Sequence, residues 1–362
     1  MTETSDIEKI ENVEKTSDEK GDEPAPLRSV HTNSFADVLK HFGISLLVTT
    51  YQAGKLVILR ENNGIVNTHF RDFKRPMGLV ADKNGFMVGC AKEVWTFLNM
   101  PELIPKLDPP DKHDACYLPR SQHITNNIDV HEMARASNGE LWLVNTRFSC
   151  LCTLNAQYSF VPRWHPPFIS TLYPDDRCHL NGLCMVDGKP KYVTALGESN
   201  KEEGWRENKA KGGFLMDIPT QKPLLSGLSM PHSPRWYQNQ LWLLESGNGS
   251  LAKANIKEQK IETVAELPGF TRGMDFCGNL AFIGLSQVRE SAVFSGIPIA
   301  ERLKERTCGI WVVDIFTGKT VAFLKFEDAV QEIFAVQVLH GLRFPEIMDW
   351  EDELLGSSYM LP

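Results

Sequence analysis

Short apolar runs separated by turns dominate the chain from residue 44 onward. The runs are rich in Val, Ile, Leu, Phe and Trp, and pairs such as Asn-Gly, Asp-Gly and Thr-Gly punctuate them. This pattern is typical of an all-β protein. Before these runs Phe35, Val38, Leu39 and Phe42 recur at helical spacing, which predicts one short helix over residues 34–42.

An internal repeat organises the predicted strands. Each unit opens with a short strand whose second residue is polar or otherwise distinctive, and a turn and a very apolar strand follow. Val130-His131-Glu132-Met133, for example, leads to Leu141-Trp142-Leu143-Val144. The openings lie roughly 40 to 60 residues apart, which fits one four-stranded blade of a β-propeller each. Their second residues are Met77, His131, Asn181, His232, Arg272 and Glu332.

The two ends of the repeat complement each other. Residues 44–73 supply three strands with no inner strand before them, and the opening at Glu332 has no outer strands after it. We therefore predict an all-β, six-bladed β-propeller closed by N-terminal outer strands and a C-terminal inner strand, which removes two exposed sheet edges. A count of seven blades holds instead if residues 100–127 hide further strands.

The propeller is expected to form a single domain over residues 31–345. Residues 1–30 are dominated by charged and small polar residues, so we predict a disordered acidic tail there. Residues 346–362 are predicted to form a C-terminal tail. The long connections 100–127, 164–178, 197–212 and 286–308 are expected to surround the mouth of the propeller, where Trp205 and Arg206 would form a stacking wall.

Composition narrows the classes of partner. The net charge of −8 and the pI of about 5.7 argue against a nucleic-acid partner, which requires a basic face. No apolar run approaches the roughly 20 residues that span a bilayer, so no membrane partner is expected. The eight cysteines lie mostly within apolar runs and lack paired CxxC spacing. We read them as free thiols and predict a cytoplasmic protein.

Several longer motifs carry a resemblance to a known family. They include Leu47-Val48-Thr49-Thr50-Tyr51-Gln52-Ala53-Gly54, Asp176-Arg177-Cys178-His179-Leu180-Asn181-Gly182 and Met230-Pro231-His232-Ser233-Pro234-Arg235-Trp236. Over residues 34–345 the chain resembles a mainly bacterial family known as Domain of Unknown Function 4915. The resemblance implies a β-propeller and carries no activity. More distantly the layout is similar to gluconolactonase and NHL-type propellers, whose calcium ligands are matched here only by Glu332 and Asn181.

The second residues of the six openings are expected to converge on the axis of the ring. Five of the six are polar, and each polar group left unsatisfied in a buried position costs roughly 1–3 kcal/mol. The ring therefore implies water, a metal ion or a polar ligand in the channel.

Two roles are open for the axial side chains. His131, His232 and Glu332 are predicted either to bind a divalent metal or, with His179, to act as acid–base groups. Imidazole ligands favour iron, manganese or zinc over calcium. Arg272 suits a carboxylate or phosphate ligand. Asn181, Asp129 and Asp176 complete the predicted binding set.

Two functions follow, and the sequence does not decide between them. One is an enzyme that acts on a small anionic substrate of the carbohydrate or modified-peptide kind. The alternative is a non-catalytic scaffold whose mouth loops and acidic tail bind a protein partner.

Overall fold

Six four-stranded antiparallel sheets form the molecule. The computed structural model describes residues 27–287 and 296–361, so most of the predicted acidic tail lies outside the described residues. We number the sheets as blades and give the innermost strand of each first. Blade 1 contains β25 (Ala335–His340), β2 (Ile44–Thr49), β3 (Lys55–Asn62) and β4 (Ile65–Asp72). Blade 2 contains β5 (Leu79–Asp82), β6 (Gly85–Gly89), β7 (Glu93–Asn99) and β8 (Ala115–Ile124).

The other four blades follow in chain order. Blade 3 contains β9 (Val130–Arg135), β10 (Leu141–Asn145), β11 (Cys150–Asn155) and β12 (Tyr158–Trp164). Blade 4 contains β13 (Leu180–Val186), β14 (Lys189–Ala195), β15 (Gly213–Asp217) and β16 (Lys222–Leu228). Blade 5 contains β17 (Pro231–Tyr237), β18 (Gln240–Glu245), β19 (Ser250–Asn255) and β20 (Lys260–Glu266). Blade 6 contains β21 (Phe270–Cys277), β22 (Leu280–Ser286), β23 (Cys308–Asp314) and β24 (Thr320–Phe326).

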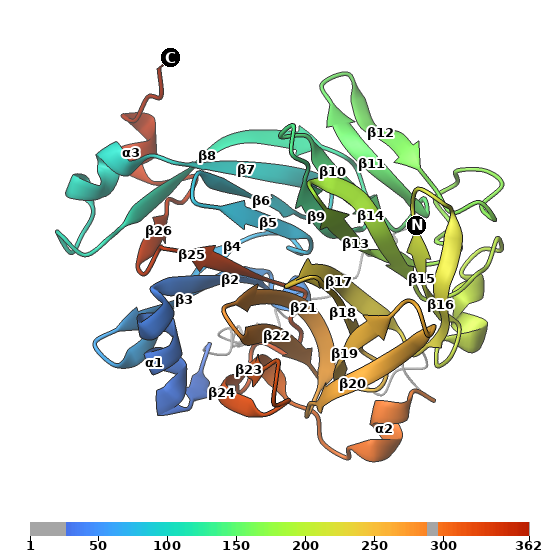
Figure 1. The fold of residues 1–362 in the computed structure, drawn as a ribbon. Helices are drawn as coiled ribbons and strands as arrows, with labels where there is room; N and C mark the ends of the chain where they lie inside the picture. Colours follow the sequence, from blue (N-terminus) through green and yellow to red (C-terminus); the bar gives the residue numbers. More distant parts are fainter. Residues whose placement is uncertain (1–26, 288–295, 362) are drawn as a thin grey trace, which may run out of the picture.

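The ring closes as the sequence predicts. In Figure 1 the blue β2 and the red β25 run side by side, although they come from opposite ends of the chain. Each inner strand contacts the next one around the ring, and β25 contacts both β21 and β5. The six-bladed propeller is therefore confirmed. The seven-blade alternative is wrong, because residues 100–127 contain only the outer strand of blade 2 and a short 3₁₀ helix, η2 (Pro101–Lys106).

A few elements lie outside the blades. The predicted N-terminal helix is confirmed as α1 (Asn33–Phe42), and β1 (Ser29–His31) adds an antiparallel strand to the edge of blade 6. The connections carry η1 (Tyr51–Ala53), η3 (Gly204–Asn208) and α2 (Pro298–Arg302), and α3 (Glu353–Gly356) follows the last strand. None of these helices has the length and apolar character of a membrane-spanning segment in the part of the chain that is described.

The hydrophobic core is divided among the junctions between blades. Six clusters of buried apolar side chains each join two neighbouring blades, including the junction between blades 1 and 6, where α1 also packs. Burial of a strand on both faces requires a continuous apolar run, and β2 and β22 are buried along their whole length. Burial of this apolar surface is the main force that holds the blades in a closed ring.

Hydroxyl side chains tie neighbouring blades together at the same place in four blades. Each lies at or just after the end of a blade's second strand and donates a hydrogen bond to a carbonyl at the start of the next inner strand. The pairs are Thr49 with Met77, Thr146 with Leu180, Ser246 with Thr271, and Ser286 with Ile333. Because the hydroxyl proton is committed, each oxygen can still accept a hydrogen bond from a further donor.

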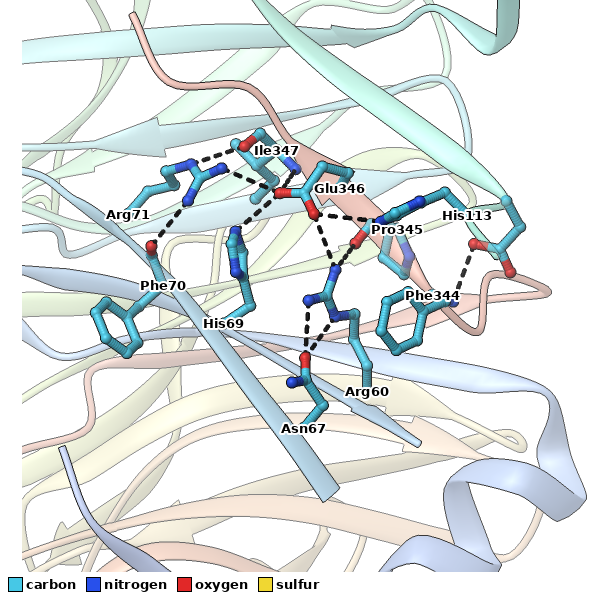
Figure 2. A network of polar contacts seen from close by, with 11 residues as sticks. Arg60, Asn67, His69, Phe70, Arg71, His113, Phe344, Pro345, Glu346 and Ile347 are labelled. Atoms are coloured by element: carbon cyan, nitrogen blue, oxygen red, sulfur yellow. Dashed lines mark hydrogen bonds and ion pairs between the residues drawn. The ribbon is translucent and has the colours of Figure 1, made fainter. Parts of the chain in front are cut away.

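The chain beyond the ring is anchored to blade 2. Residues of the predicted C-terminal tail form part of β26 (Pro345–Ile347), which pairs in parallel with β8. Figure 2 shows Glu346 of β26 among cationic side chains: its carboxylate lies 3.2 Å from Arg60, 3.1 Å from Arg71 and 2.8 Å from His69. Arg60 also donates to the carbonyl of Pro345. This network holds β26 against the outer strands of blade 1.

Candidate functional site

A pocket of about 280 Å³ lies where the inner strands begin. Six of the eight predicted site residues line it: Asp129, His131, His179, His232, Arg272 and Glu332. They come from blades 3, 4, 5 and 6 and from the segment before β25. The axial positions that the repeat identifies therefore meet in one cavity, although up to about 200 residues of sequence separate them.

The remaining predicted residues lie beside the pocket rather than on its surface. Asp176 stands behind His179, and its Oδ2 accepts hydrogen bonds from His179 Nδ1 (2.7 Å) and Trp205 Nε1 (3.0 Å). Asn181 is buried, and its Oδ1 accepts a hydrogen bond from the Thr194 hydroxyl at 2.8 Å. Met77 is also fully buried. Asp176 thus acts on the pocket through His179 and Trp205, which both line it.

His131 and His232 occupy equivalent places in blades 3 and 5. The Nδ1 of His131 lies 2.8 Å from the Thr146 hydroxyl and 3.2 Å from the carbonyl of Asp129. The Nδ1 of His232 lies 2.9 Å from the Ser246 hydroxyl and 2.9 Å from the Met230 carbonyl. The residues that provide these carbonyls, Asp129 and Met230, have φ values of 55° and 48°. Strained backbone of this kind tends to persist where it positions functional groups.

These contacts fix the tautomer of both rings. Each hydroxyl already donates its proton to a carbonyl of the next inner strand, so towards the imidazole it can only accept. The second partner of each Nδ1 is a carbonyl, which also only accepts. Nδ1 must therefore carry the proton, and in the neutral ring Nε2 holds a lone pair.

The two rings are also kept neutral. Burial lowers the pKa of His131 well below its usual value, and the nearby His179 and Arg272 lower it further. Burial, Arg272 and His131 likewise lower the pKa of His232. At neutral pH both side chains therefore offer an uncharged Nε2 acceptor.

This protonation state is directly measurable. In long-range ¹H–¹⁵N spectra of ¹⁵N-histidine-labelled protein at pH 6, His131 and His232 are expected to show neutral rings with the proton on Nδ1, because their pKa values are lowered. Free histidine, half-protonated near pH 6.5, serves as the reference. A His131 or His232 ring that is half-protonated at that pH would contradict the buried geometry described here.

His179 forms a carboxylate–imidazole pair with Asp176. Both residues have positive φ values, 51° and 47°. The imidazole packs edge-on against His131 with 4.7 Å between ring centroids, and it lies against Trp205 at 4.5 Å. Since Asp176 accepts from Nδ1, the proton of a neutral His179 is held there and Nε2 keeps a lone pair. This is the usual arrangement of a general base that is oriented by a carboxylate.

Arg272 supplies a buried positive charge in the pocket. Its Nη1 donates to Glu332 Oε1 at 3.0 Å, and its guanidinium lies 3.6 Å from the centroid of the Phe334 ring. Within the described residues only Nη1 has a hydrogen-bond partner, and Nε and Nη2 are not sealed from solvent. A guanidinium with donors left over is a binding group for a carboxylate or phosphate.

The predicted metal site finds no support in the geometry. Within residues 27–287 and 296–361 no three His, Cys, Asp or Glu side chains are grouped to hold a metal ion. Arg272 bonds to Glu332 and lies near both axial histidines, and its positive charge disfavours a dication. Iron, manganese, zinc or calcium binding through His131, His232 and Glu332 stays a prediction.

Comparison with known proteins places the chain in a family. The model of the family described as Domain of unknown function (DUF4915) matches residues 33–348. The chain belongs to the DUF4915 family. The sequence resemblance is thus confirmed over nearly the whole propeller, and it brings no activity with it. A comparison with curated proteins finds no match.

Two solved structures are similar to this DUF4915 propeller at low sequence identity. A chain in the crystal structure of a nidogen/laminin complex is 8% identical, with a TM-score of 0.48, and the match covers 82% of this chain and 99% of that one. A protein of unknown function from Bacteroides caccae is 11% identical, with a TM-score of 0.49 and coverage of 82% and 98%. Both TM-scores are below 0.5, and the fold rests on the strand pairing described above.

Sequence reasoning missed most of the aromatic wall of the DUF4915 pocket. Tyr51 and Phe334 stack with 5.6 Å between centroids, and Phe270 lies 5.8 Å from the His232 ring. Tyr51 belongs to η1, in the turn between β2 and β3. Of the aromatic residues that line the pocket, only Trp205, on a long connection, was expected at the mouth, and it lines the pocket together with Arg206. The wall gives the pocket apolar faces beside its polar floor.

Proposed function

We propose that the axial pocket binds a small anionic ligand and is the active site of an enzyme that uses imidazole as its acid–base group. The observation that carries this proposal is that the largely buried Arg272, which within the described residues has a hydrogen-bond partner only at Nη1, lines the same cavity as two neutral histidines. An anionic group would bind to the guanidinium. Hydroxyl or amine hydrogens elsewhere on the ligand would be accepted by Nε2 of His131 and His232.

The same arrangement suggests the substrate class. Carbohydrate acids, phosphorylated sugars and modified peptides carry an anionic group together with hydroxyl or amine hydrogens. Tyr51, Trp205, Phe270 and Phe334 line the same cavity, so this aromatic wall would contact the apolar side of such a molecule. His179, oriented by Asp176, would remove or return a proton at the reacting atom.

A cytoplasmic location belongs to this proposal, supported by eight buried cysteines that form no disulfide.

Ligand binding is tested with a paired substitution in the pocket. Replacing Arg272 alone would remove the guanidinium that pairs with Glu332, so Arg272→Gln is combined with Glu332→Gln. For any small carboxylate or phosphate that binds the wild-type chain, the affinity is expected to fall about 10- to 150-fold, the contribution of a hydrogen bond to a charged group. Isothermal titration calorimetry measures it, after a thermal-shift screen of sugar acids, sugar phosphates and hydroxy acids.

A matched control separates this effect from loss of an ion pair in general. Arg163 and Glu140 form an ion pair in blade 3, with Nη1 2.7 Å from Oε1, and neither residue lines the pocket. The pair Arg163→Gln and Glu140→Gln should leave affinity unchanged. If no small anion binds the wild-type chain, or if the two double variants bind the anion with equal affinity, the proposal is wrong and the scaffold alternative gains support. Elemental analysis of the same samples decides the metal prediction.

A further inference from the structure

A second cavity, of about 210 Å³, lies at the outer edge of blades 1 and 2, apart from the axial pocket. Four aromatic side chains line it: Phe73, Trp95, Phe97 and Trp350. Phe73 follows β4, Trp95 and Phe97 belong to β7, and Trp350 follows β26. We refer to these four residues as the aromatic cage. Pockets for drug-sized ligands are larger, about 300–1,000 Å³, so this cavity suits a small head group.

The rings of the cage stand at steep angles to one another. Trp95 and Trp350 lie 5.7 Å apart with an interplanar angle of 63°, and Phe73 and Phe97 lie 6.0 Å apart at 72°. Phe97 is held from behind by a parallel stack with Phe86 at 4.5 Å. Trp350 is 65% exposed, although it is one of the largest apolar side chains. Because all four side chains line one cavity, they can contact one small ligand together.

The charges around the cage favour a cation. Three carboxylates, Asp72, Glu93 and Asp349, line the cavity with Arg71 and Lys74. Each of the three nitrogens of Arg71 already donates a hydrogen bond, to the carbonyls of Ile347 and Phe70 and to Glu346, as Figure 2 shows.

Of the three carboxylates, Asp72 pairs with Lys55. Neither Glu93 nor Asp349 forms a salt bridge within the described residues, and Lys74 is exposed. Two unpaired carboxylates thus face one solvated lysine. A bound cation would gain from both carboxylates.

The C-terminal segment is held firmly enough to preorganise the cage. The Glu346 network of Figure 2 and the pairing of β26 with β8 fix residues 345–347. Met348 is buried against η2 and β8. Asp349 and Trp350 follow directly, so their backbone starts from a fixed point. A preformed site loses less free energy on binding than one that must first be ordered.

We propose that the aromatic cage binds an organic cation of the quaternary or methylated ammonium type. Such a cation is attracted to the electron-rich faces of tryptophan and phenylalanine, and it has few or no N–H donors that need hydrogen-bond partners. Glu93 and Asp349 add long-range attraction without having to form a hydrogen bond. A free choline-like molecule and a trimethylated lysine side chain share this chemistry.

The test compares choline with a neutral compound of the same shape. Choline and tetramethylammonium are titrated into the full chain by isothermal titration calorimetry, with 3,3-dimethylbutan-1-ol as the uncharged analogue of choline. Saturable binding of both cations is expected, with the neutral alcohol about 3- to 30-fold weaker because it lacks the cation–π attraction. Equal binding of choline and the alcohol, or no saturable binding of either cation, would overturn the proposal.

Substitutions locate the binding to the cage. Trp350→Ala and Trp350→Leu are both expected to weaken choline binding about 3- to 30-fold, since leucine keeps apolar bulk and lacks the ring face. Phe316→Ala is the matched control, because Phe316 is 74% exposed and lies in a turn of blade 6. Wild-type affinity in Trp350→Leu would show that apolar contact alone binds the ligand, against the proposal.

Two further titrations identify the ligand and distinguish the aromatic cage from the axial pocket. A peptide with trimethyl-lysine is titrated beside its unmethylated form. Tighter binding of the methylated form supports the cage, equal binding of the two forms counts against it, and the tighter ligand of choline and the methylated peptide identifies the source. The paired Arg272→Gln and Glu332→Gln variant should bind choline like the wild type. Loss of binding in that variant would show that the cation occupies the axial pocket instead.

Discussion

Replacing Glu132 with glutamine is expected to lower the free energy of unfolding by about 3–5 kcal/mol at pH 7. Glu132 on β9 accepts two hydrogen bonds from Arg235 on β17, at 3.1 and 3.0 Å. The contact crosses from blade 3 to blade 5, with blade 4 between them in the ring. Both side chains are largely buried, so the substitution leaves the Arg235 charge inside the protein without its counterion. Urea denaturation measures the loss.

The size of this effect depends on burial, which suitable controls can show. The exposed pair of Arg163 and Glu140 has a similar contact, and Glu140→Gln should cost about 0–1 kcal/mol. Replacing both Glu132 and Arg235 with methionine should restore most of the stability, because the Arg235 charge is removed with its partner and the nearby Asp275 carboxylate keeps its hydrogen bonds from the Val338 and Phe276 amides. A loss below 1 kcal/mol for Glu132→Gln would mean that water reaches this pair in solution.

The repeat in the sequence made much of the site predictable. Residues at equivalent positions of similar blades point in equivalent directions, so His131, His232 and Arg272 could be expected to meet on the axis without knowledge of any contact. The number of blades and their closure followed from strands missing at one end and left over at the other. These inferences use symmetry, which a single sequence displays.

Departures from the repeat were not predictable. Asn181 is the second residue of its opening, as His131 and His232 are of theirs. Its side chain nevertheless bonds to the Thr194 hydroxyl and does not line the pocket. Arg235 could not be matched with Glu132, because β17 contains a register shift between His232 and Arg235 that changes which side chains face the axis. The aromatic cage brings together residues 73, 95 and 350, and no periodicity relates them.

The contacts between blades repeat around the ring, whereas the side chains that line the pocket differ from blade to blade. This combination fits the proposed function. The hydroxyl contacts between blades recur four times, but only in blades 3 and 5 does the hydroxyl also hold an imidazole. In both blades the hydroxyl that donates to the next inner strand also sets the histidine tautomer. Removing the Thr146 or Ser246 hydroxyl would therefore disturb the ring and the pocket together. Structural and functional roles cannot be separated by a single substitution there.

Acid is expected to weaken the anchor of the C-terminal segment at Glu346. Burial alone would raise the pKa of Glu346, but the hydrogen bond with His69 and the charges of Arg60 and Arg71 lower it to about 2. Because the pKa is lower in the folded state than the unperturbed value of about 4.3, the ionised carboxylate stabilises the fold above that value. The contribution, about 3 kcal/mol, is lost as the pH falls towards 2.

The substitution Glu346→Gln isolates this contribution from all other carboxylates. Its destabilisation relative to wild type should be about 3–5 kcal/mol at pH 7, since Arg60 is left buried without a counterion. The difference should shrink by about 3 kcal/mol between pH 5 and pH 2, as the wild-type carboxyl becomes neutral like the amide. Urea denaturation across this range measures it, with the exposed Glu351→Gln as control. A difference that stays constant with pH would show that Glu346 titrates as an ordinary solvated carboxyl, and that β26 is held by strand pairing alone.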